Sequence, residues 1–459
     1  MMSRRRLLGF TAVLAVLGLA GCGGPAATEA SGGGARSSES PGAADSGAPD
    51  GHGAIAGAAE TAEAPLALLS VDAAGSVGLL DLLDGTTSTL GTIDAPGTSG
   101  AGATPIALVS DGRYAFVSTA TGLAIADSGR WTWDHVDHFH YYRAEPRLLG
   151  TVPGSGVATV TTGPLSTAGG TGLFFGASGE AVLLDNRALS EGRVEERFRL
   201  GTGADHGLLA PLGDGALLGV DGELTALNRD GAPLDARIAC TDPAGAIVTR
   251  VGLAVSCAEG AVLAVADGED PVLELIPTPA GAPAERARDF EGRKGRPTVA
   301  ALAGGDSPAG SGSGAASGAS TPAGGFWLLD TRARALTHVP SAVPLLRVAA
   351  VDDAEGHVVA LDAEGRVRVF LAESGAETGA TEPLLGGTPG AAGAGGTEEA
   401  EDPGSEPPAG VSLTVDGQRA YLSDPVAGVV HEIAYAGEVR VARTLETPTE
   451  PRFVAEVGR

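Results

Sequence analysis

The chain has 459 residues, of which 57 are acidic and 30 are basic, so its formal net charge is −27. This charge excludes nucleic acid as an expected partner, because few cationic side chains are available to neutralise phosphates, and it favours cations or basic surfaces. The length is more than one small core needs and suits a repeated architecture.

The N-terminus has the pattern of an export signal. A basic cluster at 4–6 precedes an apolar run over 7–19, which is followed by Ala20-Gly21-Cys22. Small residues before a cysteine are typical of a lipobox, and the run is shorter than the roughly 20 residues that span a bilayer. We therefore expect residues 1–21 to be a signal peptide and Cys22 to carry the lipid, palmitate included. This lipid would anchor a bacterial protein to the outer face of the cell membrane.

Two questions about this signal stay open. An ordinary signal peptide followed by an unmodified Cys22 is the alternative to the lipobox. Ser3-Arg4-Arg5 resembles part of a twin-arginine signal, and the general secretory route is the other possibility for export.

Residues 22–64 are rich in Gly, Ala, Ser, Pro and Glu and lack bulky apolar side chains. Such a segment cannot offset the entropy of ordering, so we expect it to be a flexible tether. The folded body then covers 65–459. Its basic residues are arginines except for Lys294, and this composition is typical of a GC-rich genome.

Short apolar runs separated by Asp-Gly or Glu-Gly turns fill the body, in the pattern of β-hairpins. The pattern is clearest in Leu108–Ser118 and is matched in Leu413–Ser423. Units of about forty to fifty residues, each a small antiparallel sheet, are typical of propeller blades. We expect an all-β fold, a β-propeller of eight blades, with seven as the alternative because 131–165 is either an insertion or a blade. The expected units start near residues 66, 105, 157, 206, 246, 297, 347 and 410.

Two stretches interrupt the repeat. Gly304–Gly325 consists almost entirely of Gly, Ser, Ala and Pro, and Ala372–Gly410 is similar with an acidic end. We expect both to be disordered, solvated loops between strands.

Two cysteines follow Cys22, and each closes a short, mostly apolar run. A disulfide between Cys240 and Cys257 would contribute roughly 3 kcal/mol, and an exported protein permits it. Two free buried thiols are the alternative.

Familiar enzyme motifs are absent from the sequence, which has no Walker loop, no G-x-S-x-G and no C-x-x-C. The single lysine, Lys294, lies in a Gly-Arg-Lys-Gly-Arg-Pro segment and is expected to be a solvated loop residue. We therefore expect no enzymatic activity.

The segment 131–142 stands out because it holds three of the eight histidines, His135, His138 and His140, and five aromatic residues. Neutral imidazole suits Zn²⁺. Alternate residues of a strand share a face, so His138 and His140 should point together, with Asp134 on the same side. His135 joins them only if the chain turns near Val136-Asp137, and Asp134 or Asp137 would orient an imidazole or ligate directly.

A fourth ligand must come from elsewhere, and His206 is favoured because it lies at the start of a unit, where loops gather at one face of a propeller. His338, His357 and His431 lie within or beside strand-like runs and are expected to be structural, and His52 falls in the tether. A histidine-rich surface loop without specific metal, or aromatic packing, is the alternative. Copper also suits imidazole, so the sequence leaves the choice between the two metals open.

The export signal, the propeller-like body and the segment 134–146 (DHVDHFHYYRAEP) together resemble the AztD-type zinc metallochaperones, over most of the body but not the tether or the two insertions. The resemblance implies a β-propeller that binds zinc and passes it to the zinc-binding solute-binding protein of an ABC importer. Its histidine motif maps onto His135, His138 and His140, and its His-Gly element onto His206. The tether has only His52, so an auxiliary histidine-rich capture segment is weak or missing.

Two other functions stay open from the sequence alone. A metal-dependent propeller enzyme of the lactonase or lyase type would use Asp134, Asp137 or Glu145 as general base, and a plain interaction propeller would need no metal. Four protein ligands favour storage and transfer, whereas three plus water favour catalysis. We expect a zinc-binding monomer.

Overall fold

The computed structural model describes residues 53–95, 98–134, 138–268, 270–304, 323–385 and 410–459, which all belong to one compact unit. These residues form 36 strands and one short helix. None of their helices is long and apolar enough to cross a membrane. Cys22 and the predicted signal peptide lie outside the described residues.

The strands are grouped into sheets, most of them with four antiparallel strands. The first three groups are β2 (Ala67–Val71), β3 (Ser76–Asp81) and β4 (Thr87–Thr92) with β36 (Phe453–Val457); β7 (Ala107–Ser110), β8 (Tyr114–Thr119), β9 (Gly122–Asp127) and β12 (Arg147–Pro153); and β13 (Ala158–Thr162), β14 (Gly170–Phe175), β15 (Glu180–Asp185) and β16 (Glu196–Gly201). Next are β17 (Leu208–Leu212), β18 (Gly215–Val220), β19 (Glu223–Leu227) and β20 (Pro233–Ala239), and then β21 (Ala246–Val248), β22 (Leu253–Cys257), β23 (Gly260–Val265) and β24 (Val272–Pro277).

The remaining sheets complete the ring. A seven-stranded sheet contains β25 (Arg286–Glu291), β26 (Thr298–Gly304), β27 (Ala323–Asp330), β28 (Ala335–Ala350), β29 (His357–Asp362), β30 (Val367–Leu371) and β31 (Glu377–Ala380), and the last four-stranded sheet contains β32 (Leu413–Val415), β33 (Ala420–Asp424), β34 (Val429–Ala434) and β35 (Arg440–Glu446). Outside the ring sheets are β1 (Ala59–Thr61), β10 (Arg130–Asp134), β11 (Phe139–Arg143), the small pair β5 (Asp94–Ala95) and β6 (Thr98–Gly102), and the helix α1 (Asn186–Ser190).

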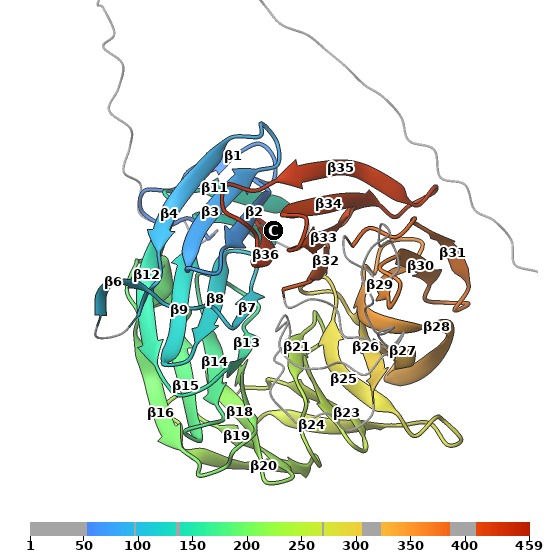
Figure 1. Cartoon of the computed structure of the whole chain (residues 1–459). Coiled ribbons are helices and arrows are strands. Elements are labelled where there is room, and N and C mark those ends of the chain that lie inside the picture. The colour runs from blue at the N-terminus through green and yellow to red at the C-terminus, as the bar shows by residue number, and fades with distance from the viewer. Residues whose placement is uncertain (1–52, 96–97, 135–137, 269, 305–322, 386–409) are drawn as a thin grey trace, which may run out of the picture. The chain divides into compact units, whose positions relative to one another are not determined.

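The sheets surround a central axis as in a β-propeller, and strands are counted from the axis outward (Figure 1). The innermost, first strands include β36, β7, β13 and β21, and the outermost, fourth strands include β4, β12, β16 and β24. The long strand β28 pairs with β27 through its first half and with β29 through its second half, so it serves as an outer strand and then as an inner one. The C-terminal strand β36 pairs with β2 and closes the ring. The predicted all-β propeller is confirmed, while the count of eight blades stays a prediction.

The repeated Asp-Gly turn has a clear physical cause. Asp111 accepts hydrogen bonds through Oδ1 from the backbone N–H groups of Arg113 (2.8 Å) and Tyr114 (2.7 Å). Asp416, at the matching position of the second copy, accepts from two N–H groups in the same way, at 2.6 and 2.7 Å. An aspartate that binds its own backbone favours a turn, so each copy reverses from the first strand of its sheet to the second.

The core lies between neighbouring sheets. In one cluster Phe116 and Ile125 of the second group pack with Leu173 and Phe175 of the third, all at 1% exposure or less. Burial of such side chains stabilises each by roughly 1.5–3 kcal/mol. The many alanines and glycines let sheets approach closely: a Cβ at Gly172 would overlap the backbone of Leu209 in the next sheet. The ring therefore forms a rigid support for its loops.

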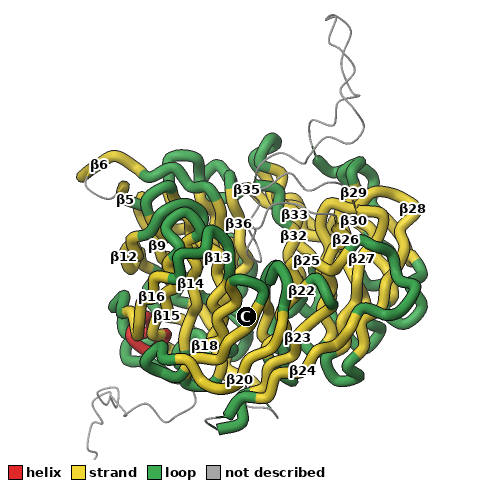
Figure 2. Tube along the Cα trace, turned by 90° about the horizontal axis from the view of Figure 1, so that it is seen from below, coloured by secondary structure: helices red, strands yellow, loops and turns green. Residues whose placement is uncertain are grey.

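The antiparallel order assigns each loop to one of two ends of the ring (Figure 2). Loops that join first to second and third to fourth strands share one end, and loops that join second to third strands or one sheet to the next share the other. We call the first the hairpin end, because the β10–β11 hairpin is inserted there between β9 and β12. The second is the disulfide end.

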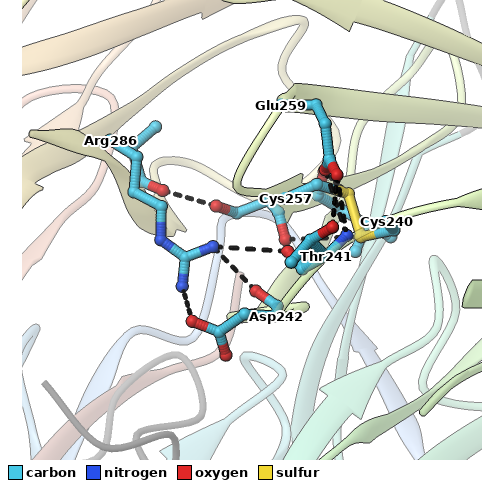
Figure 3. Close-up of a disulfide and its surroundings, with 9 residues drawn as sticks. Cys240, Thr241, Asp242, Cys257, Glu259 and Arg286 are labelled. Carbon is cyan, nitrogen blue, oxygen red and sulfur yellow. Dashed lines mark hydrogen bonds and ion pairs between the residues drawn. A yellow bond between two sulfur atoms is a disulfide. The ribbon is translucent and has the colours of Figure 1, made fainter. Parts of the chain in front are cut away.

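The predicted disulfide between Cys240 and Cys257 is present in the structure, with Cα atoms 5.0 Å apart. Figure 3 shows it joining the loop after β20 to the end of β22, with Thr241 hydrogen-bonded to Glu259 beside it. The bridge therefore ties the connection between two sheets to the β22–β23 loop at the disulfide end.

Several sequence boundaries shift in the structure. The stretch 131–165 contains the inserted hairpin and the outer strand β12, and the expected unit start at 297 misses β25, the first strand of its sheet. The predicted loop Ala372–Gly410 begins with a paired edge strand, β31, and the predicted tether contains β1. Short polar edge strands lack the apolar alternation that sequence reasoning uses.

Lys294 also differs from its expected solvated state. Its Nζ donates a hydrogen bond to the carbonyl oxygen of Asp111 (2.9 Å), a loop residue of another sheet. Burial lowers the pKa of the Lys294 amine. The lysine thus links two sheets at the hairpin end.

Candidate metal centre

The histidine segment forms the β10–β11 hairpin. Trp133 pairs with His140 and Trp131 with Tyr142 across the hairpin. The free edge of β11 pairs with β1, in which Glu60 stands opposite Tyr142. The candidate site therefore rests on a three-stranded sheet that includes a piece of the predicted tether.

Aromatic packing fixes the base of the hairpin. Trp131 is 1% exposed and stacks on Tyr142 at 5.3 Å between ring centroids. The guanidinium of Arg113 lies 4.1 Å from the Trp131 ring centroid, and Trp131 Nε1 donates a hydrogen bond to the Gly53 carbonyl at 3.1 Å. A cation over an aromatic face and buried aromatic area both stabilise this arrangement.

Polar contacts attach the same base to the ring. Arg130 forms an ion pair with the buried carboxylate of Asp81 at 2.8 Å, and Arg143 approaches that carboxylate at 3.2 Å. Thr132 donates to the carbonyl of Gly458 at 2.8 Å, next to the closing strand β36. The hairpin is thus anchored at its base while its far end carries the histidines.

His138 and His140 lie together as the strand alternation predicted. Their Nε2 atoms are 2.9 Å apart. His140 Nδ1 is 2.7 Å from Oε1 of Glu60, a residue 80 positions away in the sequence. A carboxylate on Nδ1 fixes the imidazole tautomer and turns the Nε2 lone pair outward, which is the usual arrangement behind a metal-binding histidine.

The spacing of these nitrogens fits a metal with a small adjustment. Two Zn–N bonds of about 2.05 Å at the tetrahedral angle place their nitrogens about 3.3 Å apart. The observed 2.9 Å therefore requires the exposed His138 ring to move by a few tenths of an ångström. The two imidazoles can supply two ligands, and Glu60 either orients His140 or turns to ligate.

The structure corrects the expected side of Asp134. The strand reverses before Phe139, and Asp134 pairs with Phe139 rather than continuing the alternation of His138 and His140. Asp134 therefore points to the other face of the hairpin, where its Oδ2 lies 2.6 Å from Nη2 of Arg250. His135 and Asp137 lie outside the described residues.

The structure does not bring His206 to the hairpin, so its role as a fourth ligand stays a prediction. His206 precedes β17, on a connection from one sheet to the next, and so lies at the disulfide end, opposite the hairpin. It borders a cavity of about 250 Å³ with Pro243, Gly245 and Arg288. Its Nδ1 is 2.6 Å from Asp205 Oδ1, and this hydrogen bond lowers the pKa of Asp205. The sheet that β17 begins is entered from the disulfide end of the ring, whereas the histidines of the hairpin lie at the other end.

The other body histidines lie in strands, as predicted. His338 is in β28 and packs edge-on against Trp327 at 5.1 Å between centroids. His431 is in β34 beside Thr444. Burial lowers the pKa of both imidazoles, which fits structural roles.

His357 belongs to a further group that could hold a metal. Potential ligand atoms of Asp353, Glu355 and His357 lie within 4.8 Å of one another, the one such group of three found among the described residues. Asp353 accepts from the His357 backbone N–H at 2.9 Å and contacts its Nδ1 at 2.7 Å. Burial raises the pKa of Asp353, but these bonds together outweigh burial and hold the pKa below its ordinary value. Both carboxylate oxygens of Asp353 are thus already engaged by His357 within this turn.

Sequence reasoning missed Glu60 and Arg250. Glu60 sits in a low-complexity stretch, and Arg250 follows a three-residue strand in a different sheet. Neither has a local pattern that points to the histidines. Pairing between β1 and β11 brings Glu60 to His140. The loop between β21 and β22 brings Arg250 to Asp134 at the end of β10.

Comparisons with known proteins place the chain among β-propellers. No protein-family model and no curated protein matches the sequence. Solved structures do match: the crystal structure of Citrobacter koseri AztD has a TM-score of 0.64 at 15% identity, covering 85% of this chain and 97% of that one. The structure of apo AztD from the same organism gives 0.64 at 14% identity, with 85% and 98% covered. At this low level of sequence identity, the similarity shows that the chains share a fold.

Proposed function

We propose that this chain is an extracytoplasmic zinc carrier that binds Zn²⁺ through His138 and His140 and delivers it to the zinc-binding solute-binding protein of an ABC importer. The observation that carries the proposal is the convergence of the two Nε2 atoms at 2.9 Å, with Glu60 on the far nitrogen of His140. The AztD-like fold and the AztD-like histidine segment support the same function.

The site suits transfer because the base of the hairpin is anchored while the two histidine side chains stay accessible to solvent. Trp131 and Tyr142 are buried, whereas His138 is exposed and the His140 side chain keeps 19% of its surface. An acceptor protein can therefore approach the nitrogens and replace them one at a time. Phe139, between the two histidines in the sequence, is 49% exposed on the other face of the hairpin.

The chain itself performs no covalent step in this proposal. Its residues bind the cation, orient one imidazole through Glu60, and compete with protons for the ligating nitrogens, since imidazole ordinarily has a pKa of about 6.5. The acidic surface raises the local cation concentration. Cys22 holds the carrier at the membrane, and Gly53, at the start of the described chain, contacts Trp131 at the hairpin end.

Zinc loading followed by transfer tests the proposal. The purified 23–459 protein is loaded with zinc, and its loss is followed with an excess of a fluorescent chelator and with the apo form of a zinc-binding solute-binding protein. Transfer to that protein should be faster than loss to the chelator. Equal rates would leave a zinc-binding protein and refute the carrier.

A further inference from the structure

One ion pair joins the tip of the hairpin to a distant sheet. Asp134 Oδ2 and Arg250 Nη2 are 2.6 Å apart, and their side chains are 39% and 57% exposed. Asp134 ends β10, whose hairpin is inserted between β9 and β12 of the β7–β12 sheet, and Arg250 lies between β21 and β22. The β13–β16 and β17–β20 sheets separate these two sheets along the ring (Figure 1).

This contact acts on a part of the hairpin that the base contacts do not reach. The anchors at Arg130, Trp131 and Thr132 all lie near the ring. Asp134 is the last residue of β10 and pairs with Phe139, the residue between the two histidines. A fixed Asp134 therefore fixes the backbone opposite Phe139, between the two histidines.

We propose that Arg250 is a positioning residue that clamps the hairpin tip through Asp134 and thereby slows the loss of zinc from His138 and His140. The inference rests on the proposed zinc binding, which it deepens by naming what controls release. Preorganised ligands lose less conformational entropy when they bind a metal, so a looser hairpin should release zinc faster.

A second effect of Arg250 has the opposite sign. Its positive charge repels a bound Zn²⁺, so electrostatics alone would make its removal slow the release. The clamp and the repulsion thus predict different directions for the same substitution. Because an exposed ion pair contributes little free energy, its loss should change the rate of zinc dissociation by about two- to fivefold.

The test measures zinc dissociation into excess chelator by stopped flow, on the zinc-loaded protein at about 50 mM salt. Arg250→Gln and Asp134→Asn should each raise the dissociation rate constant about two- to fivefold, and the double variant should raise it no further. Arg250→Lys should restore most of the slow rate. At about 0.5 M salt, where screening is strong, the variants should approach the unmodified protein.

Arg229→Gln is the matched control, because Arg229 is also an exposed arginine, 4.0 Å from Asp230, in a loop between a third and a fourth strand at the hairpin end. It should leave the rate unchanged, and circular dichroism should show each variant folded. A rate for Arg250→Gln equal to the control or below it, or additive effects in the double variant, would overturn the clamp. Failure of the unmodified protein to hold zinc would instead remove the proposed function and the clamp with it.

Discussion

Replacing Glu60 tests whether its carboxylate supports the zinc site. Glu60 Oε1 is 2.7 Å from His140 Nδ1, a charge-assisted hydrogen bond behind a ligand. Loss of such a partner lowers metal affinity about 10- to 100-fold. Because the Glu60 side chain is 58% exposed, water can replace part of the interaction. We therefore expect Glu60→Ala to weaken zinc binding by about 10-fold, or about 1.4 kcal/mol.

The assay is a competition titration with a chelator of known affinity at mildly alkaline pH. Glu63→Ala is the control, because Glu63 is also acidic and exposed and lies just beyond β1. It removes the same charge without touching His140, so its effect should be within about twofold. Equal zinc affinities of the two variants would refute a specific role of Glu60 behind His140, since its effect would then be one of net charge.

Three further predictions concern the fold and its anchor. Burial raises the pKa of Glu456 to about 7, so the folded protein holds this proton more tightly than the unfolded chain does. The contribution of the protonated carboxyl group to folding stability is therefore fully present below about pH 4.5 and is lost as the pH rises through 7. Glu456→Gln should therefore become more stable than the unmodified protein by up to about 3 kcal/mol between pH 5 and 8 in denaturant titrations, and a pH-independent difference would contradict this. Reducing the Cys240–Cys257 bridge should cost roughly 3 kcal/mol of unfolding free energy, and an unchanged denaturation midpoint would count against it. Cys22→Ala should abolish retention in the membrane fraction and leave a folded body, whereas unchanged retention would exclude the lipid anchor.

The sequence predicted the features that depend on local chemistry. The Asp111 and Asp416 turns bind their own backbone, so the repeat was visible as a pattern of residues. The convergence of His138 and His140 followed from strand alternation, because both belong to one side of the turn.

The features that depend on chain reversal or on distant pairing could not be predicted. Asp134 shares even numbering with His140, but it pairs with Phe139 across the hairpin, which places its side chain on the other face. His206 lies at the start of a sheet, and only the order of strands shows that this start is at the opposite end. Glu60 reaches its neighbour through a three-residue strand with no recognisable pattern.

The most direct measurement is the zinc content and affinity of the purified protein with His138→Ala, His140→Ala and His206→Ala compared in parallel. His206 is a stringent control because it also pairs its Nδ1 with a carboxylate, at 2.6 Å from Asp205, yet lies at the disulfide end. We expect about one tightly bound zinc per chain, lost progressively below about pH 6. His138→Ala and His140→Ala should each remove most of the affinity, and His206→Ala should retain it. Zinc binding that survives both hairpin substitutions, or that His206→Ala abolishes, would contradict a zinc site built on His138 and His140.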